Sequence, residues 1–144
     1  MIMQKLESTG KVPMIVKTGL HINDMSQFAS LNVIYAKSFG VRPPARVCVQ
    51  VPGNEIVAYF IIWKDPETLA KVQQNMHVQS ISHWAAPAIG PYSQANMMGD
   101  FLLLAGNIGL YPPKLAMIHA TDIVWQYRQV KANFNSVIRK ICNN

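Results

Sequence analysis

Alternating and helically spaced apolar residues divide the chain into two groups of predicted elements. In the first group, Met14–Ile22 and Arg46–Val51 alternate between apolar and polar residues, while Ile56–Trp63 is a short apolar run. Each of these stretches has the length and the β-branched content that are typical of a strand. Between the first two strands, apolar residues at steps of three and four predict an amphipathic helix. Its stripe consists of Phe28, Leu31, Tyr35 and Phe39.

The second group contains further predicted strands and ends in a longer helix. The strands are Ser80–Trp84, Tyr92–Met97 and Phe101–Ala105, and the helix begins at a capping Thr121 or Asp122. The apolar stripe of this helix consists of Val124, Tyr127, Val130, Phe134, Val137 and Ile141. The chain therefore reads β-α-β-β followed by β-β-β-α.

The spacing of these groups predicts how the chain is divided. Residues 1–13 form a disordered lead-in, 14–64 a first half, 65–79 a polar linker and 80–144 a second half. Neither half alone has enough layers to bury a sheet on a helix, so we expect both to fold into one domain. An extended linker of this length reaches roughly 50 Å, which is enough to join distant ends of such a domain.

Composition supports a single folded core. The chain has 144 residues, of which 50% are hydrophobic and only 14% are charged, and this composition argues against an intrinsically disordered protein. The net charge of +6 reflects a shortage of acidic residues, because there are only 7 of them. No apolar window is long enough for a membrane helix, and the N-terminus lacks the apolar region of a signal peptide. We therefore predict a soluble, cytoplasmic protein without a membrane partner.

The two cysteines predict neither a disulfide framework nor a metal site. Cys48 and Cys142 both lie in apolar runs, where a reduced, buried thiol is the expected state. The four histidines are scattered and lack the spacing of metal ligands. No metal is therefore expected.

Several segments resemble the Rid family of reactive intermediate deaminases, also labelled YjgF-like or endoribonuclease L-PSP. Ser82–Gln94 reads SHWAAPAIGPYSQ and Leu102–Leu110 reads LLLAGNIGL, which are similar to the opening of that family. Ile22–Val51, which contains PARVCVQV, resembles the family's later part. The resemblance implies an α+β, chorismate-mutase-like fold, with two helices on one face of a single mixed sheet of roughly six strands. It also implies a homotrimer.

The resembling parts occur in reverse order, so the predicted fold is circularly permuted. This order arises when a chain spans the end of one Rid module and the beginning of the next. A tandem arrangement with the junction SISHWAAPAIGPYSQ resembles the C-terminal region of eukaryotic diphthine–ammonia ligases. That resemblance implies elongation factor two as a partner of the parent protein. The resemblance implies that the parent ligase binds ATP through a separate domain with an SGGxD-type loop. This chain has no such loop, so no cofactor is expected here.

The same resemblance implies the site residues. In the family, the arginine of the PAR motif binds the substrate carboxylate, which makes Arg46 the candidate catalytic residue. A guanidinium offers two parallel donors that match a carboxylate, although an arginine beside a strand can also be a plain surface residue. The implied ligand is a small imino or keto acid or another carboxylate. Its implied substrate-binding residues are Tyr92, Gly106, Asn107 and Asn32.

Departures from the family pattern leave the activity open. Ala105 stands where active members carry a serine, and Phe60 stands where they carry the glutamate that positions water. A phenylalanine cannot accept a proton, so imine hydrolysis lacks a general base. We predict a Rid-like region of a diphthine–ammonia ligase, and the alternative is a 2-iminobutanoate or 2-iminopropanoate deaminase. RNA binding or endoribonuclease activity is less favoured, because the basic residues form no dense patch interleaved with aromatics.

Overall fold

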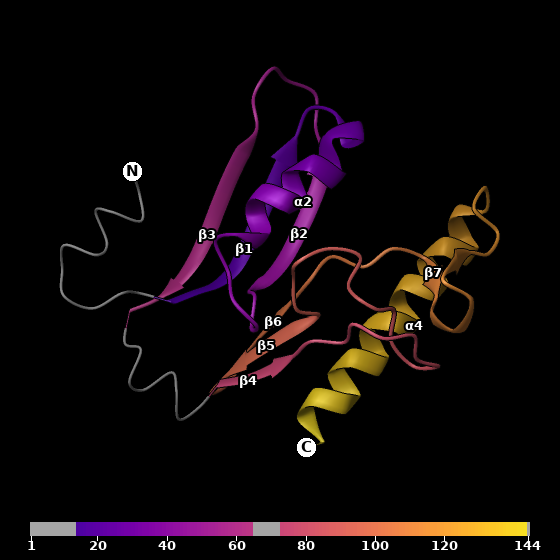
Figure 1. Cartoon of the computed structure of the whole chain (residues 1–144). Helices are drawn as coiled ribbons and strands as arrows, with labels where there is room; N and C mark the ends of the chain where they lie inside the picture. Colours follow the sequence, from indigo (N-terminus) through magenta and orange to yellow (C-terminus); the bar gives the residue numbers. More distant parts are fainter. Residues whose placement is uncertain (1–13, 65–72, 144) are drawn as a thin grey trace.

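The computed structural model describes residues 14–64 and 73–143. The first of these segments forms a mixed sheet with the strand order β2-β1-β3 (Figure 1). Strand β1 (Met14–Ile22) pairs in parallel with β2 (Ala45–Gln50) and antiparallel with β3 (Val57–Trp63). A 3₁₀ turn and helix α2 (Phe28–Ala36) connect β1 to β2. This half therefore has the β-α-β-β order that the apolar pattern predicts.

The second segment forms an antiparallel sheet with the order β4-β5-β6. Its strands are β4 (Gln73–Met76), β5 (Ala95–Met98) and β6 (Phe101–Leu104). A small pair, β7 (Leu110–Tyr111) and β8 (Ala116–Met117), precedes helix α4 (Ile123–Cys142). The described part is thus α+β, with two helices, one mixed sheet and antiparallel sheets. This arrangement is compatible with the chorismate-mutase-like fold.

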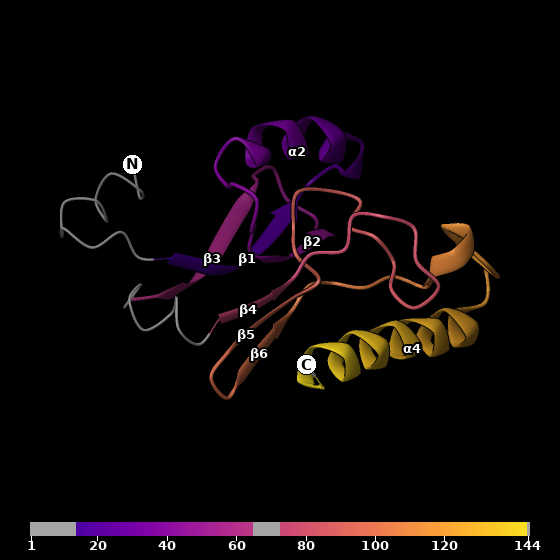
Figure 2. The same ribbon diagram turned by 60° about the horizontal axis from the view of Figure 1, so that its bottom comes forward.

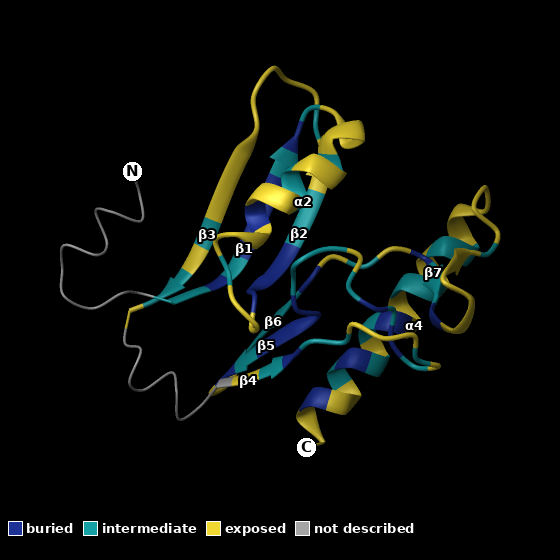
Figure 3. Ribbon diagram, viewed as in Figure 1, coloured by how far each residue is buried: buried dark blue, intermediate teal, exposed yellow. Residues whose placement is uncertain are grey.

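Each helix covers a different sheet. The buried Tyr35 of α2 donates its phenol hydrogen to the Oγ1 of Thr18 on β1 at 3.0 Å. On α4, Val137 and Ile141 pack into a buried cluster with β4 and β5. Figure 2 shows α2 above the first sheet and α4 below the second, and Figure 3 shows buried residues along β1, β5 and the inner side of α4. Within the described residues, neither helix is long and apolar enough to cross a bilayer.

Contacts at the start of β5 and along β1 join the two sheets. The pairing of β1 with β3 shifts register between Ile15 and Lys17, so Val16 lies at an irregularity in the ladder. The side-chain amide of Asn96 donates to the carbonyl of Val16 at 2.8 Å, and both residues are buried. The Oγ of Ser93 donates to the carbonyl of Pro43 at 2.6 Å. Residues 14–64 and 73–143 are therefore linked by buried hydrogen bonds.

The single sheet of the sequence prediction is wrong, because the strands form separate sheets. Among the described residues, an isolated parallel bridge, Ala45 to Ser93, connects the edge of β2 to the chain that enters β5. Directly before this bridge lie Pro43 and Pro44, which have no amide hydrogen to donate. On the side of these prolines the ladder therefore ends at Ala45, and each sheet has its own helix instead of sharing one face with the other.

The predicted linker and one predicted strand also need correction. Residues 1–13 and 65–72 lie outside the described residues, but Gln73–Met76 forms β4, inside the range predicted as a linker. Ser80–Trp84 forms no strand in this structure. There, the Ser82 hydroxyl donates to the carbonyl of Ala85 at 2.7 Å and accepts from its amide at 3.0 Å. This local bonding closes a turn in place of a strand.

The start of α4 depends on Asp122. Its carboxylate accepts hydrogen bonds from the amides of Val124 at 2.9 Å and Trp125 at 3.0 Å. We expect Asp122→Ala to lower the free energy of unfolding by about 1 kcal/mol, because the first turn loses its cap. Urea denaturation measures this loss, with Asp100→Ala in an exposed turn as the control. An unchanged midpoint would contradict the assigned cap.

Candidate functional site

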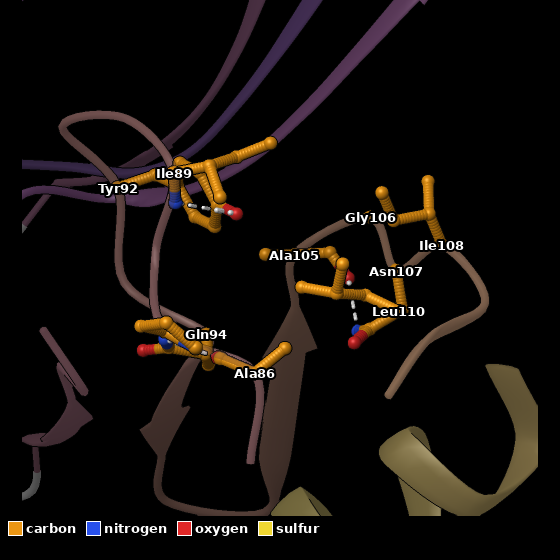
Figure 4. A pocket seen from close by; sticks show the side chains of 10 residues that line it. Ala86, Ile89, Tyr92, Gln94, Ala105, Gly106, Asn107, Ile108 and Leu110 are labelled. Atoms are coloured by element: carbon orange, nitrogen blue, oxygen red, sulfur yellow. Dashed lines mark hydrogen bonds between the residues drawn. The ribbon is translucent and has the colours of Figure 1, made fainter. Parts of the chain in front are cut away.

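A cavity of about 370 Å³ lies where the two halves meet. Its walls come from β2, from the turn and first residue of α2, and from the loops around residues 89–92 and 106–108. The lining residues are Met25, Phe28, Arg46, Val47, Cys48, Val49, Ile89, Tyr92, Gly106, Asn107 and Ile108. A smaller pocket of about 30 Å³ shares Tyr92 and Gly106 with it and is drawn in Figure 4. The site is therefore mostly apolar, with few polar groups.

Arg46 is the charged residue of this lining. Its side chain is only 3% exposed, yet Nη1 and Nη2 have no hydrogen-bond partner within the described residues. Burial is the main reason why the pKa of Arg46 is lowered from its ordinary value. A buried cation with free donors is unfavourable unless an anion pairs with it. Within the described residues, the cavity wall therefore holds a buried positive charge without a hydrogen-bonded counter-charge.

Aromatic rings surround the guanidinium of Arg46. Its Cζ lies 5.5 Å from the ring centroid of Phe28, 4.7 Å from that of Tyr35 and 5.3 Å from that of Tyr92. Such faces attract a cation electrostatically without occupying its N–H donors. The hydrogen bond from Tyr35 to Thr18 fixes one of these rings against β1. The rings thus hold the charge in place while its hydrogen-bond donors stay free.

Gly90 and Asn32 lie beside the guanidinium. A Cβ atom added to Gly90 would lie 2.7 Å from Nη2 of Arg46 and 3.0 Å from Oδ1 of Asn32. Only a glycine allows the backbone to approach both groups so closely. The Oδ1 of Asn32 is buried and has no hydrogen-bond partner in the described part of the chain. Asn32 therefore neighbours Arg46, although it is not among the residues that line the cavity.

The other candidate residues line both pockets. The amide of Gly106 donates to the carbonyl of Arg46 at 3.1 Å, which connects the end of β6 to β2. The side chain of Asn107 donates to the carbonyl of Ala105 at 3.3 Å, as Figure 4 shows. The phenol oxygen of Tyr92 accepts from the amide of Ile89 at 3.4 Å. The structure thus gathers Arg46 with these residues, and their roles toward a ligand stay predictions.

Of the two positions that depart from the family pattern, Ala105 lines a pocket and Phe60 does not line the larger cavity. Phe60 lies on β3, where it pairs with Thr18 of β1, and it does not line the cavity. Ala105 lines the smaller pocket, and its amide donates to the carbonyl of Gln94 at 2.8 Å. No carboxylate is among the lining residues of the described cavity. In residues 14–64 and 73–143, no three His, Cys, Asp or Glu side chains gather as metal ligands.

Sequence reasoning missed part of the site. Phe28 and Tyr35 belong to the predicted helix stripe, and the sequence pattern assigns them no role beside Arg46. Their spacing of seven residues puts both on one helix face, which is the signal that could have paired them with Arg46. Cys48 was interpreted as a buried thiol, whereas it is half-buried and lines the cavity; Cys142 was interpreted in the same way and is exposed.

The two buried tyrosines of the site predict that the free energy of unfolding decreases at alkaline pH. Burial raises the pKa of Tyr35 and Tyr92 above the ordinary value of 10.0. Below that value the phenols are neutral in both the folded and the unfolded chain. Above it, the unfolded chain ionises first, so the free energy of unfolding falls as the pH rises. We expect this fall in urea denaturation series, with a shallower slope in Tyr35→Phe and Tyr92→Phe.

Tyr59→Phe serves as the control for this series, because Tyr59 is 44% exposed on β3. Its slope should match that of the unchanged chain. Equal slopes for all the variants would contradict the assignment of the effect to the buried phenols.

Two curated relatives of the chain are diphthine–ammonia ligases. The ligase of Schizosaccharomyces pombe is 38% identical over 95 residues, which are 63% of this chain and 15% of the ligase. The ligase of Saccharomyces cerevisiae is 32% identical over 120 residues, which are 72% of this chain and 18% of the ligase. The chain therefore spans less than a fifth of the length of either ligase.

Shorter segments are similar to proteins of the Rid and RutC type. Protein MMF1, mitochondrial, of Saccharomyces cerevisiae is 44% identical over 45 residues, or 31% of each chain. A RutC family protein of Pyrococcus horikoshii is 43% identical over 37 residues, which are 26% of this chain and 29% of that protein. No family model and no solved structure match the chain. Its homologues thus include diphthine–ammonia ligases and RutC proteins, each over part of the length.

Proposed function

We propose that the cavity beside Arg46 binds a small organic carboxylate, such as an imino or keto acid. The observation that carries this proposal is the guanidinium itself, which is 3% exposed and has two nitrogens without partners. A carboxylate would satisfy both nitrogens through a bidentate, charge-assisted pair. The apolar lining, including Phe28 and Ile108, suits a short hydrocarbon body behind that group.

The test of this proposal compares charged and neutral ligands of the same shape. Calorimetric titration with 2-oxobutanoate should show binding, whereas 2-oxobutanamide should bind much more weakly, because it lacks the negative charge. Equal affinity for the acid and the amide, or no binding of the acid, would overturn the assignment of an anion site.

We further propose that this site belongs to a Rid-like region of a larger, diphthine–ammonia ligase-like protein. The similarity to both yeast ligases supports this role, because it extends over 63% and 72% of the chain. The proposal includes the permuted order of the two halves. It also includes an action of the larger protein on elongation factor two in the cytoplasm. The transcripts that encode this chain should then also encode an upstream ATP-binding domain. Transcripts without such a domain would remove the ligase role.

Imine deamination is the second candidate. The similarity to RutC family proteins favours it, together with the free guanidinium beside Gly106 and Tyr92. The absence of a carboxylate among the described lining residues speaks against fast hydrolysis, since no side chain there activates water. Release of keto acid from an enzymatically generated imine measures the activity. A clear acceleration that is lost in Arg46→Ala would favour the deaminase over a binding role.

The homotrimer implied by the family is also a proposal. Strand β3 exposes Val57, Tyr59 and Ile61, which alternate along the strand and therefore share one face of the sheet. A second and third copy of the chain would cover this apolar face. Sedimentation equilibrium gives the molecular mass, and a monomeric mass would contradict the trimer.

A further inference from the structure

A thiol lies next to the anion anchor in the same cavity. Cys48 follows Arg46 by two residues on β2, so both side chains point to the same face of the strand. Their Cα atoms are about 7 Å apart at the rise of a β-strand. Both residues line the 370 Å³ cavity, and Cys48 is a free, half-buried cysteine. A molecule in this cavity is therefore next to a wall that carries both a cation and a nucleophilic atom.

We propose that Cys48 is a covalent modification site for small electrophiles that carry a carboxylate. In this site Arg46 holds the carboxylate, and the sulfur attacks a carbon one or two bonds away from it. The proposal rests on the proposed function, because it uses the same anion anchor. The observations behind it are that Arg46 and Cys48 line the same cavity and that the buried Nη1 and Nη2 of Arg46 have no hydrogen-bond partner within the described residues. The ligand class is α-halo acids and α,β-unsaturated carboxylates.

The bond changes in this reaction are balanced without any further reagent. With an α-halo acid, the sulfur forms a bond to the α carbon, the carbon–halogen bond breaks, and halide leaves with the electron pair. The thiol proton passes to water. With an unsaturated acid, the sulfur bonds to the β carbon, and the electron pair of the double bond moves to the α carbon, which takes up a proton. In both cases the carboxylate stays on Arg46, so the adduct fills the anion site.

Selectivity in this site comes from binding and not from an activated thiol. Burial raises the pKa of Cys48, and the charge of Arg46 offsets this effect only in part. A neutral electrophile therefore gains nothing from the cavity, since the thiol is mostly protonated at neutral pH. An anionic electrophile is concentrated beside the sulfur by the guanidinium. Cys48 should thus discriminate between reagents by their charge.

The second cysteine of the chain provides an internal control. Cys142 is exposed at the end of α4, and Arg139 and Lys140 lie in the same last turn. It therefore reports the general attraction of anionic reagents to a basic protein. Any preference for anionic reagents that is stronger at Cys48 than at Cys142 is therefore caused by the cavity.

The experiment compares iodoacetate with iodoacetamide on the full chain, with the rate at each cysteine followed by peptide mass spectrometry. The ratio of the iodoacetate rate to the iodoacetamide rate should be at least about 10-fold higher at Cys48 than at Cys142. Arg46→Met should abolish this difference, whereas Arg42→Met, which removes an exposed cation, should preserve it. In the unchanged chain, 2-oxobutanoate should protect Cys48 and leave the rate at Cys142 unaltered.

The results separate this proposal from the anion site itself. Equal ratios at both cysteines, or no reaction of Cys48 with either reagent, overturn the modification site. If 2-oxobutanoate still binds calorimetrically in that case, the anion site stands alone. If 2-oxobutanoate does not bind, the anion site is wrong. A high ratio at Cys48 that persists in Arg46→Met excludes Arg46 as the directing group.

Discussion

Replacing Arg46 with methionine should strongly weaken carboxylate binding without destabilising the empty protein. Truncating one partner of a buried charge pair costs about 2–5 kcal/mol of binding, so the affinity for 2-oxobutanoate should fall at least about 30-fold. Without a ligand, however, the two buried Nη atoms have no partner. An apolar side chain of similar length removes that unpaired charge and still packs against the three rings. The free energy of unfolding should therefore rise by about 1 kcal/mol.

Two matched variants sharpen this experiment. Arg42→Met removes the same charge from an exposed position, so neither affinity nor stability should change much. Arg46→Lys keeps the charge but loses the planar pair of donors, so its affinity should lie between those of the unchanged chain and Arg46→Met. Calorimetry and urea denaturation provide both readouts. A large loss of stability in Arg46→Met, with binding retained, would show that Arg46 is a structural residue.

The sequence could not predict that replacing Arg46 would weaken binding and yet increase stability. The PAR motif and its resemblance indicated Arg46 as an anion ligand, but not its near-complete burial. That burial depends on Tyr35 from α2 and Tyr92 from the loop before β5, which are 57 residues apart in the chain. Apolar periodicity assigns a residue to a face, but it does not reveal which residues from other elements meet that face.

Elements with a complete local pattern were predicted well. The strand predicted over Met14–Ile22 has those bounds in the structure, and the last helix differs from its prediction by one residue at its end. The apolar period agrees with the tertiary packing in both elements, and in the helix the capping Asp122 agrees with it as well. Strand β4 was missed, because Gln73–Met76 has polar residues where a strand usually shows alternation. It is a strand through its pairing with β5, which is a non-local property.

Buried polar contacts explain why the predicted linker contains strand β4. Asn75 of β4 lies between Ser93 and Asn96, donating to the Oγ of Ser93 at 2.9 Å and to the Oδ1 of Asn96. In a sequence, asparagine and glutamine indicate exposure and turns. Here the amide side chains replace apolar packing at the junction of the two sheets. Composition therefore predicted a linker at a position where the chain forms part of that junction.

Asn96→Ala should lower the free energy of unfolding by about 2–4 kcal/mol, the largest stability effect expected in this chain. Asn96 is 1% exposed and donates to the carbonyl of Val16 on β1 at 2.8 Å. Alanine leaves this carbonyl without the Asn96 donor, removes one of the acceptors of the Asn75 side-chain amide, and opens a small cavity between the sheets. Asn135→Ala at an exposed position of α4 is the control, and its unfolding midpoint should not fall.

The same variant tests whether the two halves form one domain. Asn96 belongs to β5, whereas its acceptor Val16 belongs to β1, so the lost bond joins the first sheet to the second. If both halves unfold together, hydrogen exchange in Asn96→Ala should accelerate equally in β1–β3 and in β5–β6, because one global opening exposes all these amides. Faster exchange confined to β5 and β6 would mean that the halves unfold separately. In that case the single-domain prediction is wrong, and the contacts around Val16 do not couple the two sheets.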